Sequence, residues 1–268
     1  LVVAYGVTEP EAGSNVQSLK TRADRVTDEH GEIIGYRLNG QKQFITNGGI
    51  ADYMSVFATV DPKSAHKCIG AFLVELDQPG VRRGKAIPKI GQRCSNTVGI
   101  HFNDVRVPAE NVLALPGQGF GLAMKTFSRT RPIIGAFAVG AARSALEYAL
   151  DYAKKRRTFG ARIGDNQAIQ FKLAEMATRI DAGRLLGYRA AQLKDEDKPC
   201  HREASMSKLF CSTMANYVCN EAVQIHGGYG YIKEYTVERL LRDAKVTQIW
   251  EGTNQVHRQL IGRSFIEK

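Results

Sequence analysis

The sequence of 268 residues lacks several features that mark special classes of protein. It has no apolar run near the roughly 18 residues that cross a bilayer, and the longest candidate, from Pro132 to Ala142, is broken by two glycines. Its five cysteines are odd in number and form no CxxC pair, so we expect reduced, buried thiols rather than disulfides or a zinc site. Walker, GxGxxG, GxSxG and HExxH motifs are also missing, which excludes nucleotide kinases and common hydrolases. We therefore expect a soluble globular protein.

Acidic residues are fewer than basic ones, 27 against 37, which gives a formal net charge of +10 and a pI near 9.4. A basic surface favours partners that carry phosphate, such as nucleotide cofactors or nucleic acids. The length fits one large domain or two ordinary ones with a substantial core.

Residues 1–112 predict a mostly antiparallel β domain. Alternating apolar runs at 33–38, 53–58 and 69–74 are bounded by turn signals such as Asn39-Gly40.

Residues 113–268 show apolar positions every three to four residues, which predicts a bundle of four or five helices. Pro132 lies inside the first apolar helical stretch, so we expect that helix to be kinked or to begin later. Asp165 is the expected cap of another helix, and a further one stops at Gly227. In the helix after Gly252 we expect an inner face of Val256, Leu260 and Ile261.

Two loops at strand ends combine threonine with glycine, at residues 8–14 and 44–49. Each alone is consistent with an ordinary loop. Together they could offer hydroxyl and amide groups to the edges of a flat heterocycle.

The densest basic run covers residues 154–157 and is followed by Thr158. It is either a solvated helix end or a phosphate clamp, because arginine and threonine both match phosphate oxygens. Similarly, residues 224–228 are either a helix stop or a set of bare amides that meets a pyrophosphate. For His226 and His257, which have no partner at metal-ligand spacing, we favour structural roles and predict no metal site.

Glu251 is the sharpest candidate for chemistry, since it lies between Trp250 and Gly252 just before a helix. Desolvation by the aromatic ring would raise its pKa toward that of a general base, whereas a helix N-terminus would lower it. The sequence leaves open which effect prevails, and an acidic capping turn is the alternative.

Taken in order, these motifs resemble the acyl-CoA dehydrogenases, especially the medium-chain type. The resemblance rests on ordered blocks across almost the whole chain, at residues 7–14, 44–49, 91–95, 130–132, 156–160, 224–228, 242–245 and 251–253. It implies an FAD enzyme of α+β class, usually a homotetramer built as a dimer of dimers. We expect an antiparallel, barrel-like middle β domain at 1–112 and a C-terminal four-helix-bundle domain at 113–268.

The resemblance also implies site residues. The loops that hold the flavin ring match Tyr5, Val7, Thr8, Gly13, Ser14, Phe44 and Thr46. The groups that bind the FAD pyrophosphate and adenosine from a neighbouring subunit match Arg156, Thr158, Phe159, Gln167, Gln224, Gly227 and Gly228, and further FAD contacts match Thr253 and Gln255. The substrate contacts match Ser14, Arg131 and Gly252, with Ser14 and Arg131 near the CoA portion.

By resemblance, Glu251 is the catalytic base of straight-chain members, whereas isovaleryl-type enzymes carry the base at the position of Thr130. The implied reaction converts a short- to medium-chain acyl-CoA to a trans-2-enoyl-CoA in fatty-acid β-oxidation. Glu251 takes the α-proton, flavin N5 accepts the β-hydride, and the Glu251 N–H and a ribityl hydroxyl stabilise the carbonyl oxygen. An electron-transferring flavoprotein is the expected acceptor, in the mitochondrial matrix of a eukaryote or the cytoplasm of a bacterium.

Three departures from the family stand out. Phe44 replaces a tryptophan beside the flavin, and Ser128 replaces an acid at the CoA adenine. The chain starts at Leu1 without a targeting peptide or the N-terminal helical domain, so we expect the natural start to lie upstream. Two alternatives stay open, a DNA-associated flavoprotein, which the basic charge would suit, and a non-catalytic bundle subunit.

Overall fold

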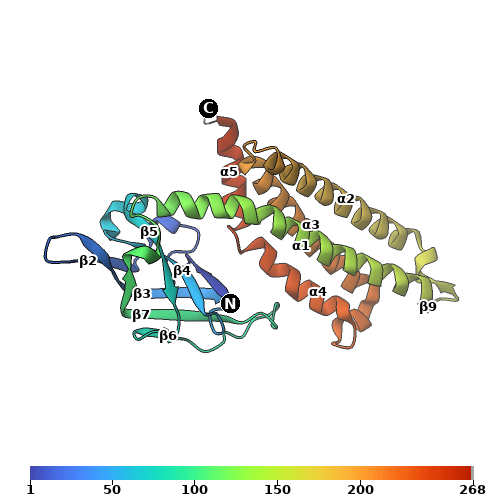
Figure 1. Cartoon of the computed structure of the whole chain (residues 1–268). Coiled ribbons are helices and arrows are strands. Elements are labelled where there is room, and N and C mark those ends of the chain that lie inside the picture. Colours follow the sequence, from blue (N-terminus) through green and yellow to red (C-terminus); the bar gives the residue numbers. More distant parts are fainter. Residues whose placement is uncertain (267–268) are drawn as a thin grey trace. The chain divides into compact units, whose positions relative to one another are not determined.

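The computed structural model describes residues 1–266, which divide into two compact units (Figure 1). The first unit comprises residues 1–89 and 93–126, and the second comprises 90–92 and the chain from 127 onward. The second domain expected from the sequence ends at residue 268, and its last two residues lie outside the described part.

The first unit is built on a mixed eight-stranded sheet in the order β6-β7-β3-β2-β4-β5-β8, with β1 beside β4. Most neighbouring strands are antiparallel, as expected, but β1 and β2 each pair with β4 in parallel. The strands are β1 Val3–Gly6, β2 Arg22–Thr27, β3 Ile33–Thr46, β4 Tyr53–Thr59, β5 Ile69–Glu75, β6 Val81–Arg83, β7 Thr97–Pro108 and β8 Val112–Ala114.

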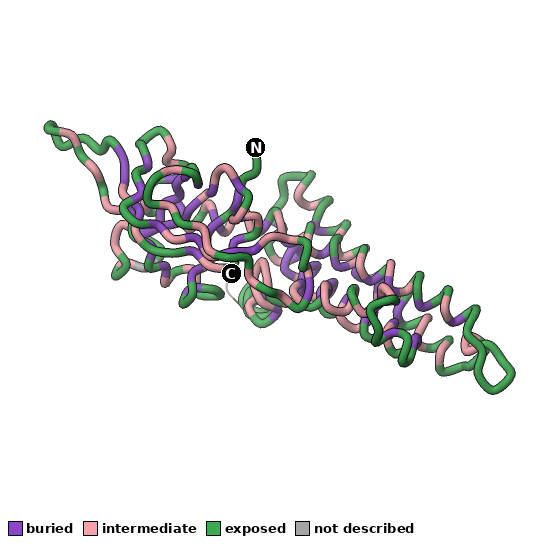
Figure 2. The backbone as a smooth tube through the Cα atoms, turned by 90° about the horizontal axis from the view of Figure 1, so that it is seen from below, coloured by how far each residue is buried: buried purple, intermediate pink, exposed green. Residues whose placement is uncertain are grey.

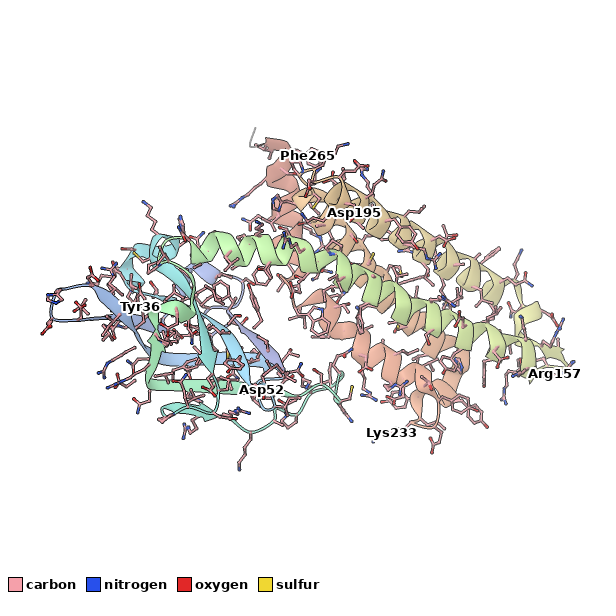
Figure 3. The ribbon with its side chains drawn as sticks, viewed as in Figure 1. Tyr36, Asp52, Arg157, Asp195, Lys233 and Phe265 are labelled. Carbon is pink, nitrogen blue, oxygen red and sulfur yellow. The ribbon has the colours of Figure 1, made fainter. Side chains whose placement is uncertain are left out.

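Alternate apolar side chains of these strands form the core of the first unit, because successive residues of a strand point to opposite faces. The rings of Tyr36 and Phe72 pack at 4.9 Å between centroids, and Leu38, Val56 and Ile100 are fully buried. Figure 3 labels Tyr36 among the strands of this unit. The packed sheet provides a rigid base for the loops at its strand ends.

The turn expected at Asn39-Gly40 is wrong, since β3 continues through it to Thr46. The pairing of β3 with β7 shifts register here, and Gly40 has a φ of +142°. A Cβ at Gly40 would lie 2.7 Å from the Cα of Thr21, so this glycine permits close backbone approach rather than a hairpin.

The second unit contains five α-helices in the described part of the chain, which confirms the expected helical bundle. They are α1 Gly119–Lys155, α2 Gln167–Asp195, α3 His201–His226, α4 Thr236–Ala244 and α5 Asn254–Ile266, with a short hairpin of β9 Arg157–Thr158 and β10 Ala161–Arg162 after α1. Their shared core uses small and flexible side chains, so the helices approach closely. Figure 2 shows the buried positions as stripes along the helices, and they include Ala142, Ala145, Met176, Met214 and Val218.

By length and composition alone, α1 is long and apolar enough to cross a membrane. Its alanines at 138, 142, 145, 149 and 153 recur at helical spacing and lie in the core of the helical unit. These contacts are those of a bundle helix. The helix begins at Gly119 and runs through Pro132, so the expectation of a later start is wrong.

Three smaller expectations are corrected by the structure. The cap of α2 is Asn166, whose side chain accepts from the Ala168 N–H, while Asp165 binds Arg162. The buried positions of α5 are Asn254 and His257, whereas Val256 and Ile261 are half-buried and Leu260 is exposed. The cysteines are free, but Cys68 is half-buried and Cys94 is exposed, and only the other three are buried.

Candidate active site

Glu251 lies in a tight turn between the Lys245–Gln248 3₁₀ turn and α5, not in the helix itself. Its φ is +54° and that of Gly252 is +91°, so two successive residues adopt left-handed backbone. Such a conformation is common for glycine and unusual for glutamate, and it persists only where surrounding contacts hold it.

The carboxyl group of Glu251 accepts a hydrogen bond of 2.6 Å from the hydroxyl of Thr130 on α1. Burial raises the pKa of Glu251, and the Thr130 hydroxyl and the charges of Arg131 and Lys208 lower it without cancelling the effect of burial. The pKa is therefore raised overall, in the direction that desolvation was expected to move it.

Three basic side chains lie against the backbone of this turn. The Arg131 Nε and the His257 Nε2 both donate to the Glu251 carbonyl, at 3.4 and 3.2 Å, and the Lys208 Nζ donates to the Gly252 carbonyl at 2.6 Å. Burial, together with the charges of Arg131 and Lys208, lowers the pKa of His257 to about 3, so this imidazole is neutral. Two cations, Arg131 and Lys208, and one neutral imidazole therefore bind the backbone carbonyls of Glu251 and Gly252.

A cavity of about 540 Å³ lies in the helical unit where α1 and α3 end. Arg156, Thr158, Gly227 and Gly228, all predicted from the sequence to contact FAD, line it together. Gly227 has φ +60° and ψ −137°, a backbone conformation that favours glycine, and a Cβ on either glycine would meet only open space.

Aromatic rings form much of the same cavity wall. Tyr152 and His226 stack at 4.3 Å between centroids, and the Arg156 guanidinium lies 5.5 Å from the ring centroid of Tyr229. Burial lowers the pKa of His226 although its Nδ1 lies 2.7 Å from the Ala222 carbonyl. The cavity thus combines flat neutral rings with a cation, a hydroxyl and bare backbone.

The structure divides the basic run at the end of α1. Arg156 faces the cavity, whereas Lys155 pairs with Asp151 and Arg157 is exposed on β9, where Figure 3 labels it. Phe159 and Gly160 turn the hairpin with φ values of +51° and +82°. Arg156 therefore remains the candidate for a phosphate contact, whereas the exposed Arg157 fits a solvated position.

Several predicted FAD residues are not part of the cavity wall. Phe159, Gln167, Gln224 and Gln255 are exposed, and the Thr253 hydroxyl accepts from the Val256 N–H at 3.4 Å at the start of α5.

In the first unit, the loop that begins at Val7 is fixed onto β3. The Gln43 N–H donates to the Thr8 carbonyl at 2.9 Å, and the buried Lys42 Nζ donates to the Val7 carbonyl at 3.1 Å. Lys42 also binds the Glu9 carboxylate at 2.6 Å, and this carboxylate accepts from two further backbone N–H groups. The Thr8 loop therefore lies beside the end of β3 that leads into the second threonine-bearing loop.

The rim of these loops is open to solvent. Phe44 has a φ of +58° at a point where β3 carries one extra residue opposite β7, and its ring is 62% exposed. Thr46, Gly13 and Ser14 are also exposed. Tyr5 packs its ring edge-on against Phe57 at 5.2 Å.

Sequence reasoning missed Glu9 with Lys42, Lys208, and the aromatic cavity wall. Glu9 belongs to the loop at residues 8–14, which the sequence analysis identified. Its buried partner Lys42 lies on β3, and no sequence pattern links the two residues. Ser128, where an acid was expected, is nearly buried and lies 2.5 Å from the His201 Nδ1. Within residues 1–266, no group of three or more His, Cys, Asp or Glu side chains is arranged to hold a metal ion.

Two family models match the chain. The model described as acyl-CoA dehydrogenase, middle domain, covers residues 4–105, and the one described as acyl-CoA dehydrogenase, C-terminal domain, covers residues 117–266.

Individual relatives agree with this match. An acyl-CoA dehydrogenase of Bacillus subtilis is 48% identical over 98% of this chain and 68% of its own length. A caffeyl-CoA reductase-Etf complex subunit of Acetobacterium woodii is 43% identical over 99% of this chain and 69% of its own length. The structure of butyryl-CoA dehydrogenase from Megasphaera elsdenii superposes with a TM-score of 0.94 at 44% identity, covering 99% of this chain and 68% of that one.

Proposed function

The chain belongs to the acyl-CoA dehydrogenases, FAD-dependent oxidoreductases that act on acyl-CoA thioesters, and we propose that Glu251 is its catalytic base. The observation that carries this proposal is the turn described above, where burial raises the pKa of Glu251 and a hydroxyl orients its carboxyl group. A base with a raised pKa takes up a proton more readily at neutral pH.

The residues present fit FAD. The cavity of the helical unit offers rings for an adenine to stack on, and Arg156, Thr158 and the two glycine amides suit a pyrophosphate. We propose that this cavity holds the adenosine and pyrophosphate portion of an FAD bound by a neighbouring subunit. We propose separately that the loops around Thr8 and Thr46 contact a flavin ring. When bound, FAD supplies the acceptor for a hydride, its N5.

Glu251 contributes two groups to the proposed reaction. Its carboxylate takes the α-proton of the thioester, while the β-hydrogen leaves with its electron pair and a double bond forms between the α and β carbons. Its backbone N–H finds no acceptor in the described part of the chain, so it can donate to the carbonyl oxygen of a thioester as charge develops there.

We propose a straight-chain acyl-CoA of short to medium length as substrate, with a trans-2-enoyl-CoA as product, in fatty-acid β-oxidation. Two observations support the straight-chain class. Position 130, where isovaleryl-type relatives carry the base, is a threonine whose hydroxyl contacts Glu251 instead of replacing it. In addition, a solved structure of similar fold is a butyryl-CoA dehydrogenase, and butyryl is a short straight chain. Another relative is a subunit of a caffeyl-CoA reductase complex, whose acyl group is larger.

The substrate proposal is tested by anaerobic titration of the flavin with butyryl-, octanoyl- and palmitoyl-CoA. We expect bleaching of the flavin absorption band with the first two and weaker bleaching with palmitoyl-CoA. Bleaching by caffeoyl- or branched thioesters alone would contradict the straight-chain class. A bound flavin that no thioester reduces would favour a non-catalytic flavoprotein, and strong, salt-dependent DNA binding would then favour the DNA-associated alternative.

The role of the base is tested by Glu251→Gln, with the exposed Glu175→Gln as the matched control. The glutamine variant should keep its flavin absorption and lose substrate bleaching by at least about a thousandfold in rate, because no group remains to take the α-proton. The Glu175→Gln protein should bleach normally. Turnover retained in the Glu251→Gln protein would remove this residue from the role of base.

We further propose that electrons pass from the reduced flavin to an electron-transferring flavoprotein and that the protein is a homotetramer. The first is supported by the relative whose name places it in an Etf complex. Reduction of purified electron-transferring flavoprotein during turnover, and the mass of the protein by light scattering, test these two statements separately.

A further inference from the structure

The turn at Glu251 needs support from elsewhere in the fold. Residues 251 and 252 both have positive φ, and only the second is a glycine. Left-handed backbone at a non-glycine residue persists where the surroundings over-determine it. Much of this support comes from α3.

Lys208, in the N-terminal half of α3, binds this turn through two hydrogen bonds. Its Nζ donates to the Gly252 carbonyl at 2.6 Å and to the Asn254 Oδ1 at 3.1 Å. The same Oδ1 accepts from the Ser212 hydroxyl at 3.0 Å, and the Asn254 Nδ2 donates to the Thr213 hydroxyl at 3.2 Å. One lysine thus ties α3 to both ends of the segment that follows Glu251.

This lysine occupies an unfavourable place for a cation. It is 0% exposed, and burial together with the charge of Arg131 lowers its pKa to about 8. Its hydrogen-bond acceptors are a carbonyl and an amide, both neutral, and in the described part of the chain the one carboxylate that favours its charged form is Glu251. Buried lysines are rare without a partner, so the position indicates a specific task.

We propose that Lys208 is a positioning residue for the dehydrogenation: its ammonium group fixes the Gly252 carbonyl and the Asn254 side chain, and so orients the carboxylate and backbone N–H of Glu251 toward the thioester. The proposal rests on the proposed function, because the orientation of Glu251 matters to catalysis only if Glu251 is the base. A cation here also favours the ionised form of the carboxyl group.

The effect of Lys208 must be separated from that of its neighbours. The groups that face Glu251 are Thr130 and Arg131 from α1, Lys208 from α3 and His257 from α5. Ser212→Ala is the matched control, because it removes an uncharged hydrogen bond to the same Asn254 oxygen and leaves the cation in place.

The first measurement is amide hydrogen exchange of the segment 249–255 in the whole protein, with its flavin bound. We expect exchange to become about tenfold faster in Lys208→Met, since a hydrogen bond to a charged group is lost, and less than about threefold faster in Ser212→Ala. Lys208→Gln, which keeps an N–H donor, serves where the methionine variant does not fold, and should lie between the two. Unchanged exchange in the lysine variants would overturn the proposal.

The second measurement is the pH dependence of flavin reduction by octanoyl-CoA. Removal of the Lys208 charge should move the midpoint of the rise in rate upward by about one pH unit, whereas Ser212→Ala should leave it in place. Equal midpoints and equal exchange for the two variants would indicate a merely structural lysine. If the unmodified protein is not reduced by any thioester, the proposed function fails, while the exchange result still decides whether Lys208 holds the turn.

Discussion

The hydrogen bond from Thr130 to Glu251 gives a direct test of how the base is tuned. Thr130→Val removes the hydroxyl that donates to the Glu251 Oε2 at 2.6 Å and keeps the shape of the side chain. Burial raises the pKa of Glu251, and this hydroxyl is first among the groups that oppose the rise. The valine variant should therefore have a Glu251 pKa that is higher still.

The size of the shift follows from the strength of the lost bond. A hydrogen bond to a charged group contributes about 1.5–3 kcal/mol, and one pKa unit corresponds to about 1.4 kcal/mol. Because Glu251 is only partly buried and Arg131 and Lys208 remain, the lower end applies. We expect a rise of about one unit.

The assay is the rate of flavin reduction by octanoyl-CoA, followed by anaerobic stopped flow across pH. The base must be deprotonated to act, so the rate rises with pH through the pKa of Glu251, and a higher pKa moves this rise to higher pH. The control is Thr178→Val, which removes a threonine hydroxyl that bonds only to its own helix. A midpoint that stays in place or moves down in Thr130→Val would refute the reasoning.

Two further substitutions test the proposed FAD cavity and the buried ion pair beneath the loop that begins at Val7. Arg156→Ala should lower the flavin content of the purified protein by about tenfold, because a cation of the cavity wall is lost. Arg157→Ala, on the exposed hairpin, should leave the flavin content unchanged. Equal flavin contents in the two variants would show that Arg156 does not bind the cofactor. Glu9→Gln should lower the free energy of unfolding in urea by about 3 kcal/mol, because Lys42 is left buried without its carboxylate, and the exposed Glu11→Gln should change it little; similar stabilities would show that the buried pair contributes nothing.

Much of the fold followed from periodicity, and the exceptions have local causes. The apolar runs in β3, β4 and β5 and the long helical stretches were all found where the sequence predicted them. Gly40 was misread because an irregularity inside a strand and a hairpin turn use the same residue types. A later start at Pro132 was wrong because tertiary packing of α1 overrides the preference of a single residue, while the alternative of a kink stays a prediction.

The site was less visible, since its parts come from distant segments. The sequence identified Glu251, and the resemblance linked Arg156 to Gly227, but no pattern connects Lys208 to Gly252 or Lys42 to Glu9. The residues that flank Lys42 on β3 and Lys208 on α3 form no pattern that predicts a buried charge. Their roles depend on which strand or helix face meets which turn, and this is set by packing rather than by local sequence.

The buried charges of Glu251 and Lys208 make the folded state less stable, and hydrogen bonds to the turn oppose this effect. The folded state raises the pKa of Glu251 above its ordinary value of 4.5, so ionisation of this group lowers stability as pH rises from that value. Folding lowers the pKa of Lys208 from 10.5 to about 8. The buried ammonium group therefore reduces the free energy of unfolding below about pH 8, and this reduction becomes smaller as the pH rises above 8. Where both groups are charged, each charge partly offsets the cost of burying the other. The pH range in which Glu251 can act as a base is therefore the range in which the site destabilises the fold, and the hydrogen bonds from Thr130, Arg131 and Lys208 keep the acid in place against that tendency.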